Sequence, residues 1–278
     1  MKYKQPQIEI MDTTLRDGEQ TSGVSFVPHE KLMIARLLLE ELKVDRVEVA
    51  SARVSDGEFD AVKMICDWAA RRNLLPRVEV LGFVDGHTSV DWIHATGCRV
   101  INLLCKGSLK HCTCQLRKTP EEHIEDIIGV VNYANEQDME VNIYLEDWSN
   151  GMKDSPEYVF QMVDALMHTN IKRYMLPDTL GVLNPLQVIE YMRKMVKRYP
   201  HAHFDFHPHN DYDLAVSNVL AAVLQGSCAQ GIGPAHSVQF FRILDLDHDY
   251  ASSAFITSAV VSSMEGQKGI TASLPRSR

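Results

Sequence analysis

Two segments of the chain combine acidic, basic and imidazole side chains at spacings that could do chemistry. The first, DTTLRDGEQ at residues 12–20, follows an alternating apolar run and sets an arginine among acids. The second, HPHND at residues 207–211, ends another alternating run. Because residues i and i+2 of a β-strand point to the same side, His207 and His209 can direct their imidazoles at one point.

These two imidazoles and the carboxylate of Asp17 would form a ligand set for a divalent metal ion with open positions. Such a set suits Mn²⁺, Mg²⁺ or Zn²⁺ with water as a further ligand. A single histidine would be assigned to the surface or to an ordinary hydrogen bond, since the chain contains 12 of them. A His-x-His pair at a strand end, opposite an acidic loop, instead favours a metal. We therefore predict that Asp17, His207 and His209 bind a metal ion.

Four other residues at or just after strand ends are candidates for substrate binding or catalysis. Arg16 supplies a fixed cation that could stabilise a developing oxyanion, or it could form a structural ion pair with Glu48. Thr179 could donate a hydrogen bond to a substrate carboxylate or cap a turn. Glu146 could orient a metal-bound water or the substrate, or could be an exposed loop acid. The residues alone leave these alternatives open.

The elements that must position these residues alternate between short strands and amphipathic helices. After a first strand at 8–11, we expect strands at 46–50, 78–83, 100–104, 140–145, 173–176 and 203–207. The spacing predicts helices over 29–42, 59–69, 87–95, from Thr119 onward, 156–168, 185–198 and 211–224.

This succession of strand–helix units implies a parallel sheet, either open and doubly wound or closed as a (β/α)₈ barrel. No G-x-G-x-x-G motif follows the first strand, which weakens the dinucleotide-binding version of the open sheet. Acidic and histidine residues follow several strand ends instead, and in a barrel all of these ends face one mouth. We therefore predict the α/β barrel (a TIM barrel).

The chain changes character after Gly226. We assign residues 1–226 to a catalytic barrel domain and find no eighth strand–helix unit in residues 227–278, which end in a Ser-rich basic stretch. A barrel with seven units would leave two unpaired edges, which is costly. We interpret 227–278 as an atypical tail, either disordered or produced by a reading-frame shift near codon 226.

Composition narrows the function further. The chain has 278 residues and a formal net charge of −9, which argues against nucleic acid as a partner. It shows neither a leader pattern nor a run of 18 apolar residues, so we expect a cytoplasmic protein without a membrane partner. No C-x-x-C pair is present. His111 beside Cys112 and Cys114 could bind a soft metal, but reduced loop thiols are the simpler interpretation.

The segments at 12–20 and 207–211 resemble the paired signatures of the 2-isopropylmalate synthase and homocitrate synthase family. These enzymes are metal-dependent Claisen-condensing barrels, and the match is closest to 2-isopropylmalate synthase. VEVAS at 47–51 and DTLG at 178–181 also lie where that family has its strand-two and strand-six motifs. The wider group includes citramalate synthase and hydroxymethylglutaryl-CoA lyase.

The resemblance implies a Mn²⁺, Mg²⁺ or Zn²⁺ ion held by Asp17, His207 and His209, with a 2-oxo acid chelated through its carboxylate and ketone oxygens. It implies that acetyl-CoA, deprotonated at its methyl group, attacks this ketone, and that thioester hydrolysis then releases CoA. Arg16 and Glu146 would be catalytic, and Arg16, Glu48 and Thr179 would bind substrate. The resemblance does not identify the general base.

The resemblance also bears on the substrate. An aspartate at position 17 favours isopropylmalate or citramalate synthase, because homocitrate synthases often carry Glu there. We therefore expect an acyltransferase that uses 2-oxoisovalerate in leucine biosynthesis, as a homodimer. Citramalate synthase, homocitrate synthase and a hydroxymethylglutaryl-CoA lyase-like enzyme are alternatives. A truncated non-catalytic paralogue is a further one, because residues 227–278 do not match the family's Gly-Glu-Arg-x-Gly-Asn motif.

Overall fold

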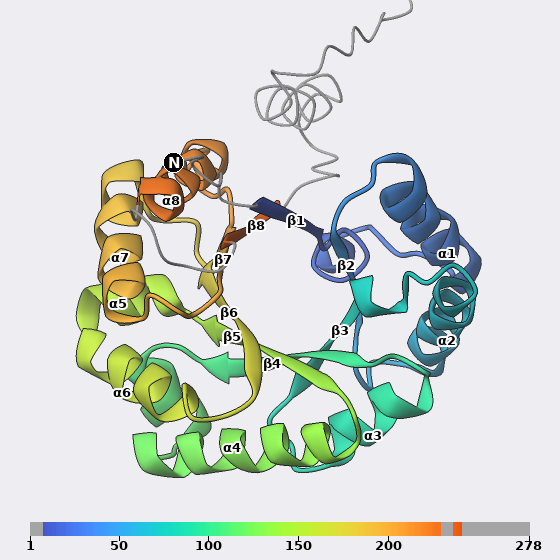
Figure 1. Ribbon diagram of the computed structural model, residues 1–278, viewed down its shortest axis with the longest axis horizontal. Helices are drawn as coiled ribbons and strands as arrows, with labels where there is room; N and C mark the ends of the chain where they lie inside the picture. The colour runs from blue at the N-terminus through green and yellow to red at the C-terminus, as the bar shows by residue number, and fades with distance from the viewer. Residues whose placement is uncertain (1–7, 229–235, 241–278) are drawn as a thin grey trace, which may run out of the picture. The chain divides into compact units, whose positions relative to one another are not determined.

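The computed structural model describes residues 8–228 and 236–240, and its strands form one closed parallel barrel (Figure 1). Each strand pairs with its neighbours in sequence order, and the last strand pairs with the first. The predicted (β/α)₈ barrel is therefore confirmed, and the open doubly wound sheet is excluded. The strands are β1 (Ile8–Asp12), β2 (Arg46–Ser51), β3 (Val78–Phe83), β4 (Val100–Lys106), β5 (Glu140–Glu146), β6 (Ile171–Asp178), β7 (Phe204–Pro208) and β8 (His236–Phe240).

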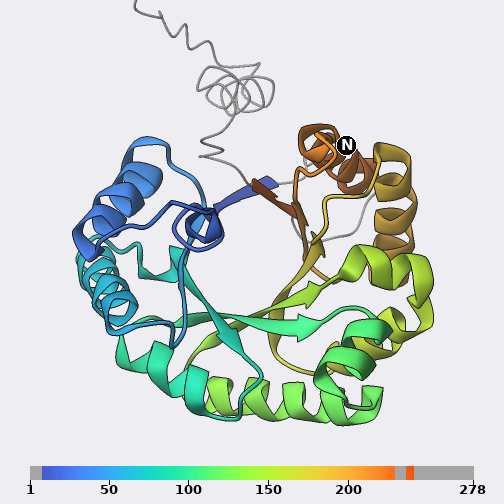
Figure 2. The same cartoon turned by 180° about the vertical axis from the view of Figure 1, so that it is seen from behind.

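Helices lie outside the barrel around most of its circumference (Figures 1 and 2). Within the described residues, no helix has both the length and the apolar content that crossing a membrane requires. The helices are α1 (Pro28–Arg36), α2 (Asp56–Ala70), α3 (Thr88–Ala95), α4 (Pro120–Glu136), α5 (Trp148–Asp154), α6 (Pro156–Leu166), α7 (Pro185–Arg198) and α8 (Ala215–Cys228), with the short elements η1 (Gly18–Gln20), η2 (Leu37–Glu41), η3 (Leu75–Arg77) and η4 (His111–Leu116).

Two of these helices differ from the sequence prediction. The short helix α5 was not predicted, because its sequence WSNGMKD is too short and too polar to show a helical period. Helix α8 begins at Ala215 rather than near residue 211. Asn210 accepts the Ala215 N–H through its side-chain oxygen at 3.1 Å, and Asp213 has a left-handed φ of 56°, so the intervening residues form a loop.

Strand β8 supplies the strand of an eighth unit, and among the described residues no helix follows it. It lies parallel to β1, with Ile10 opposite Val238, and parallel to β7, with Asp205 opposite Ser237. Five residues carry too little alternation to mark a strand in the sequence, but pairing them removes both open edges of the barrel. The rest of the predicted tail, apart from residues 227 and 228, lies outside the described residues.

The inside of the barrel is layered. An apolar layer formed by Met11, Leu81, Tyr144 and Met175 crosses its middle. At the N-terminal ends of the strands, the buried guanidinium of Arg46 pairs with Glu79 (Nη1–Oε1 3.0 Å) and Asp205 (Nη2–Oδ2 2.5 Å). Buried charges are tolerated only when paired in this way. This buried charged cluster lies at the N-terminal ends of β2, β3 and β7, opposite the strand ends that the predicted site residues follow.

Candidate metal and substrate site

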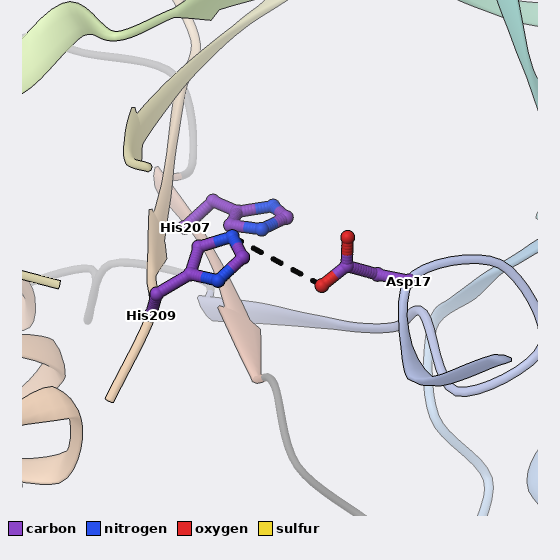
Figure 3. Close-up of side chains that lie close together, drawn as sticks. All are labelled: Asp17, His207 and His209. Atoms are coloured by element: carbon purple, nitrogen blue, oxygen red, sulfur yellow. Dashed lines mark ion pairs between the residues drawn. The ribbon is translucent and has the colours of Figure 1, made fainter. Parts of the chain in front are cut away.

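Asp17, His207 and His209 converge at the C-terminal mouth of the barrel (Figure 3). Each offers a ligand atom, and these atoms all lie within 4.8 Å of one another. His209 Nε2 lies 4.0 Å from Asp17 Oδ2, and the centroids of the two imidazole rings are 5.4 Å apart. His207 is buried, whereas Asp17 and His209 are partly accessible. The structure thus brings the three predicted ligands together, and their binding of a metal stays a prediction.

Among the residues that the structure describes, these three form the only such group of His, Cys, Asp or Glu side chains. The soft-metal alternative at His111, Cys112 and Cys114 therefore has no geometric support. Cys112 is buried, and its thiol donates to the carbonyls of Lys118 at 3.4 Å and Thr119 at 3.6 Å. A thiol hydrogen-bonded in this way fits the simpler interpretation.

The two ligand segments are held by their own backbones. The carbonyl of Thr13 accepts three N–H groups, those of Arg16 (3.0 Å), Asp17 (2.8 Å) and Gly18 (3.2 Å), which folds the loop after β1 into a tight turn. On the other side, the His209 N–H donates to the Asp178 carbonyl at 3.2 Å. Asp17 and His209, the two predicted ligands that follow a strand end, are therefore positioned by hydrogen bonds of the main chain.

Asp178 and Gly181 of the DTLG motif support the segment that carries His209. The Asp178 carboxylate accepts the N–H groups of Val182 (3.2 Å) and Leu183 (2.9 Å), which closes the turn after β6. Gly181 has a φ of +59°, and a Cβ there would lie 2.6 Å from the backbone nitrogen of Asp211. Only glycine allows this approach without strain. The motif at the end of β6 thus supports the segment that carries the predicted metal ligand His209.

Arg16 is fixed by three partners around its guanidinium. Its Nε donates to Glu48, its Nη1 donates to Asp17 Oδ1 at 2.7 Å, and its Nη2 donates to the Tyr144 hydroxyl at 3.2 Å. The structural ion pair with Glu48, which the sequence left as an alternative, is therefore formed. The same contacts keep the cation beside a predicted metal ligand, so the two interpretations of Arg16 are compatible.

Glu48 lies behind Arg16 rather than in the open mouth, because it is fully buried. Burial raises the pKa of Glu48, and Arg16 opposes this shift. The other carboxylate oxygen accepts a hydrogen bond from Asn102 Nδ2 at 2.7 Å, and Asn102 in turn accepts one from Asn142 Nδ2 at 2.9 Å. The predicted contact of Glu48 with substrate stays a prediction, whereas its contact with Arg16 is observed.

Sequence reasoning missed Asn102, Asn142 and Tyr144. The two asparagines were counted as strand residues, although an uncharged polar residue inside an apolar run was a usable signal. All three are nearly or fully buried, and each reaches Arg16 directly or through Glu48. Together they form a hydrogen-bonded chain from the middle of β5 to the guanidinium.

Glu146 pairs with Lys106, a residue that the sequence did not mark. The two residues are opposite each other in the β4–β5 register, and the Lys106 ammonium donates to the Glu146 carboxylate. The Lys106 N–H donates to His123 Nε2 at 3.0 Å, and its carbonyl accepts the Tyr158 hydroxyl at 2.9 Å. Burial lowers the pKa of His123 to about 4, so this imidazole is a neutral acceptor at pH 7.

Thr179 joins the loop after β6 to the loop after β5. Its hydroxyl oxygen accepts the Asp147 N–H at 2.9 Å. Asp147 has a left-handed φ of 65°, and its carboxylate accepts the Ser108 hydroxyl at 2.7 Å. This contact links two loops and is not the turn cap that the sequence left as an alternative, and Thr179 remains partly accessible.

Comparison with known proteins places this geometry in context. The model of the HMGL-like family matches residues 7–233. The chain is 34% identical over 221 residues to a probable 2-isopropylmalate synthase of Ignicoccus hospitalis, covering 80% of this chain and 53% of that protein. It is 33% identical to the (R)-citramalate synthase of Methanocaldococcus jannaschii, covering 79% and 43%. The chain thus spans about half the length of the curated relatives it matches.

Solved structures share the fold at low identity. The hydroxymethylglutaryl-CoA lyase of Pseudomonas aeruginosa has a TM-score of 0.64 at 17% identity, covering 84% of this chain and 76% of that one. The carboxyl transferase domain of Rhizobium etli pyruvate carboxylase, solved with pyruvate and biocytin, has a TM-score of 0.61 at 15% identity and covers 85% and 40%. These similarities concern the barrel alone.

Proposed function

We propose, from the premise that this chain belongs to the HMGL-like family, that it is an acyltransferase which condenses acetyl-CoA with a 2-oxo acid. The observation that carries the proposal is the convergence of Asp17, His207 and His209 beside the fixed guanidinium of Arg16. The 2-oxo acid we propose is 2-oxoisovalerate, which would give 2-isopropylmalate for leucine biosynthesis. The relatives named 2-isopropylmalate synthase support this choice.

The donor set fits a divalent ion. Two imidazoles and one carboxylate lie within reach of a single point, and the accessible sides of Asp17 and His209 leave room for further ligands. This set suits Mn²⁺ or Mg²⁺, with Zn²⁺ as the alternative. A bound ion would supply Lewis-acid polarisation of the substrate ketone.

The chain's own residues would then orient the substrate and stabilise its charge. Arg16 is held by Glu48 and Tyr144, so it can face a developing oxyanion without reorganising during the reaction. Thr179 offers a hydroxyl for a substrate carboxylate. Glu146, held by Lys106, would orient the acyl thioester or the water that hydrolyses it.

A second candidate is citramalate synthase, in which pyruvate replaces 2-oxoisovalerate. It is favoured by a relative of that name at nearly the same identity as the isopropylmalate synthases. The two activities differ only in the side chain of the 2-oxo acid, and therefore in the lining of the mouth. We further propose that the enzyme is cytoplasmic and works as a homodimer, which light scattering on the purified protein would test.

The experiment that tests the function is release of free CoA thiol from acetyl-CoA in the presence of Mn²⁺ or Mg²⁺. Parallel reactions contain 2-oxoisovalerate, pyruvate, 2-oxoglutarate or no 2-oxo acid. We expect release with 2-oxoisovalerate, and its loss in an Asp17→Asn variant. Release with pyruvate alone would assign the citramalate activity. Absence of release from folded protein that binds Mn²⁺ would refute the enzymatic proposal and favour a non-catalytic paralogue.

A further inference from the structure

Lys31 is a fully buried lysine in the middle of α1, close in sequence to the loop that carries Arg16 and Asp17. Lysine is almost never fully buried unless its charge is paired. Its ammonium contacts two carboxylates, Glu19 Oε2 at 2.5 Å and Glu58 Oε1 at 2.6 Å. The ammonium of Lys31 therefore links helix α1 to Glu19 in the loop after β1 and to Glu58 in α2.

The same ammonium also donates to two backbone carbonyls, that of Leu15 at 3.0 Å and that of Val49 at 3.3 Å. Leu15 immediately precedes Arg16 in the loop after β1, and Val49 immediately follows Glu48 in β2. Lys31 therefore joins the backbones on either side of the Arg16–Glu48 ion pair. The two hydrogen bonds of Lys31 therefore hold the loop after β1 at a fixed distance from strand β2.

The loop depends on this cation in two ways. Leu15 is fully buried, and removing the ammonium would take away the hydrogen-bond donor to its carbonyl. The carboxylates of Glu19 and Glu58 would then repel each other without a neutralising charge. Glu19 also accepts the Phe26 N–H at 2.8 Å, so its movement would disturb the far end of the same loop.

We propose that Lys31 is a positioning residue for the metal site, which acts on Asp17 and Arg16 through the Leu15 carbonyl. This inference rests on the metal site of the proposed function. A side chain of helix α1 would thus control the geometry of the loop that carries Arg16 and Asp17.

The test measures Mn²⁺ binding to the metal-free protein by isothermal titration calorimetry, independently of turnover. The variant Lys31→Met with Glu58→Gln removes the cation and neutralises one of its carboxylate partners. The matched control, Arg46→Met with Asp205→Asn, removes a similarly buried ion pair at the opposite end of the barrel. Thermal unfolding in EDTA reports the stability of each protein.

We expect the Lys31 variant to bind Mn²⁺ at least tenfold more weakly than the unmodified protein, and the Arg46 control to bind it normally although it is destabilised. Equal Mn²⁺ affinity in the Lys31 variant and the unmodified protein would overturn the inference alone. Failure of the unmodified protein to bind Mn²⁺ would overturn both this inference and the proposed metal site. If the double variant does not fold, Lys31→Arg replaces it, because this substitution keeps the charge but alters the contact to the Leu15 carbonyl. Normal Mn²⁺ affinity of the Lys31→Arg protein would also overturn the inference.

Discussion

A Gly181→Ala substitution would test whether the turn after β6 supports the metal ligands. Gly181 adopts a φ of +59°, in the left-handed region, which costs an L-residue about 1–2 kcal/mol. An added Cβ would also lie 2.6 Å from the backbone nitrogen of Asp211 and 3.0 Å from the carbonyl carbon of His209. Both of these atoms belong to the backbone, so no side-chain rotation can relieve the contact.

The segment from His209 to Asp211 must therefore move away from β6, and His209 must move with it. Strain and displacement together give an expected loss of about 3 kcal/mol in the free energy of unfolding. Because His209 Nε2 lies only 4.0 Å from Asp17, the same movement separates two predicted ligands. We expect Mn²⁺ affinity to fall by about tenfold or more, equivalent to roughly 1.4 kcal/mol.

Urea denaturation of the metal-free protein and Mn²⁺ titration would measure the two effects separately. Gly129→Ala is the matched control, because Gly129 lies inside α4 and an added Cβ would meet nothing within 4 Å. It should stabilise the protein by about 0.5–1 kcal/mol and leave Mn²⁺ binding unchanged. A Gly181→Ala protein with normal Mn²⁺ affinity would refute the reasoning that this turn positions His209.

Three further substitutions have defined outcomes. Asp12 is buried, and burial raises the pKa of its carboxyl group from 3.8 to about 6. The protonated carboxyl group therefore contributes its full share to the free energy of unfolding below about pH 4, and this contribution is lost as the pH rises through 6. Asp12→Asn should therefore stabilise the protein at pH 7 by up to about 3 kcal/mol and flatten the pH dependence between 4 and 6 in thermal unfolding; an unchanged pH profile would contradict this. Asn102→Leu should lower stability by about 1–3 kcal/mol in urea denaturation, because a Glu48 oxygen loses its donor, and wild-type stability would contradict it. Lys106→Met should lower the rate of CoA release, because the Glu146 carboxylate loses the ammonium group that holds it in place; an unchanged rate would show that this ion pair does not position Glu146 for the reaction.

Strand periodicity and strand-end chemistry were enough to predict the barrel and its three converging donors. Asp17, His207 and His209 each stand at or just after a strand end, and in a parallel barrel these ends face one mouth. The prediction needed no knowledge of side-chain contacts, because the topology alone brings such positions together. Strand β8 was not predicted because its five residues show little periodicity. Its position is set by the free edges of β1 and β7, with which it pairs.

Contacts between distant segments could not be predicted from the same patterns. The sequence allowed Arg16 to face substrate or to pair with Glu48, and only the fold shows that it pairs while remaining beside Asp17. Lys31 was counted among the polar residues of an amphipathic helix, whereas its ammonium points inward to carboxylates and carbonyls. A linear pattern reports the average polarity of a face and not the direction of a single long side chain.

The charged cluster of Arg46, Glu79 and Asp205 also has a kinetic consequence. The three side chains are buried where β2, β3 and β7 begin, so substrates of the proposed reaction would reach the predicted metal ligands from the C-terminal mouth. In the proposed reaction both substrates would pass through that mouth, and the one bound deeper would have to arrive first and its product leave last. We therefore expect compulsory-order kinetics, in which the 2-oxo acid binds before acetyl-CoA and CoA leaves before the hydroxy acid. Product-inhibition patterns would show whether substrates bind and products leave in this order.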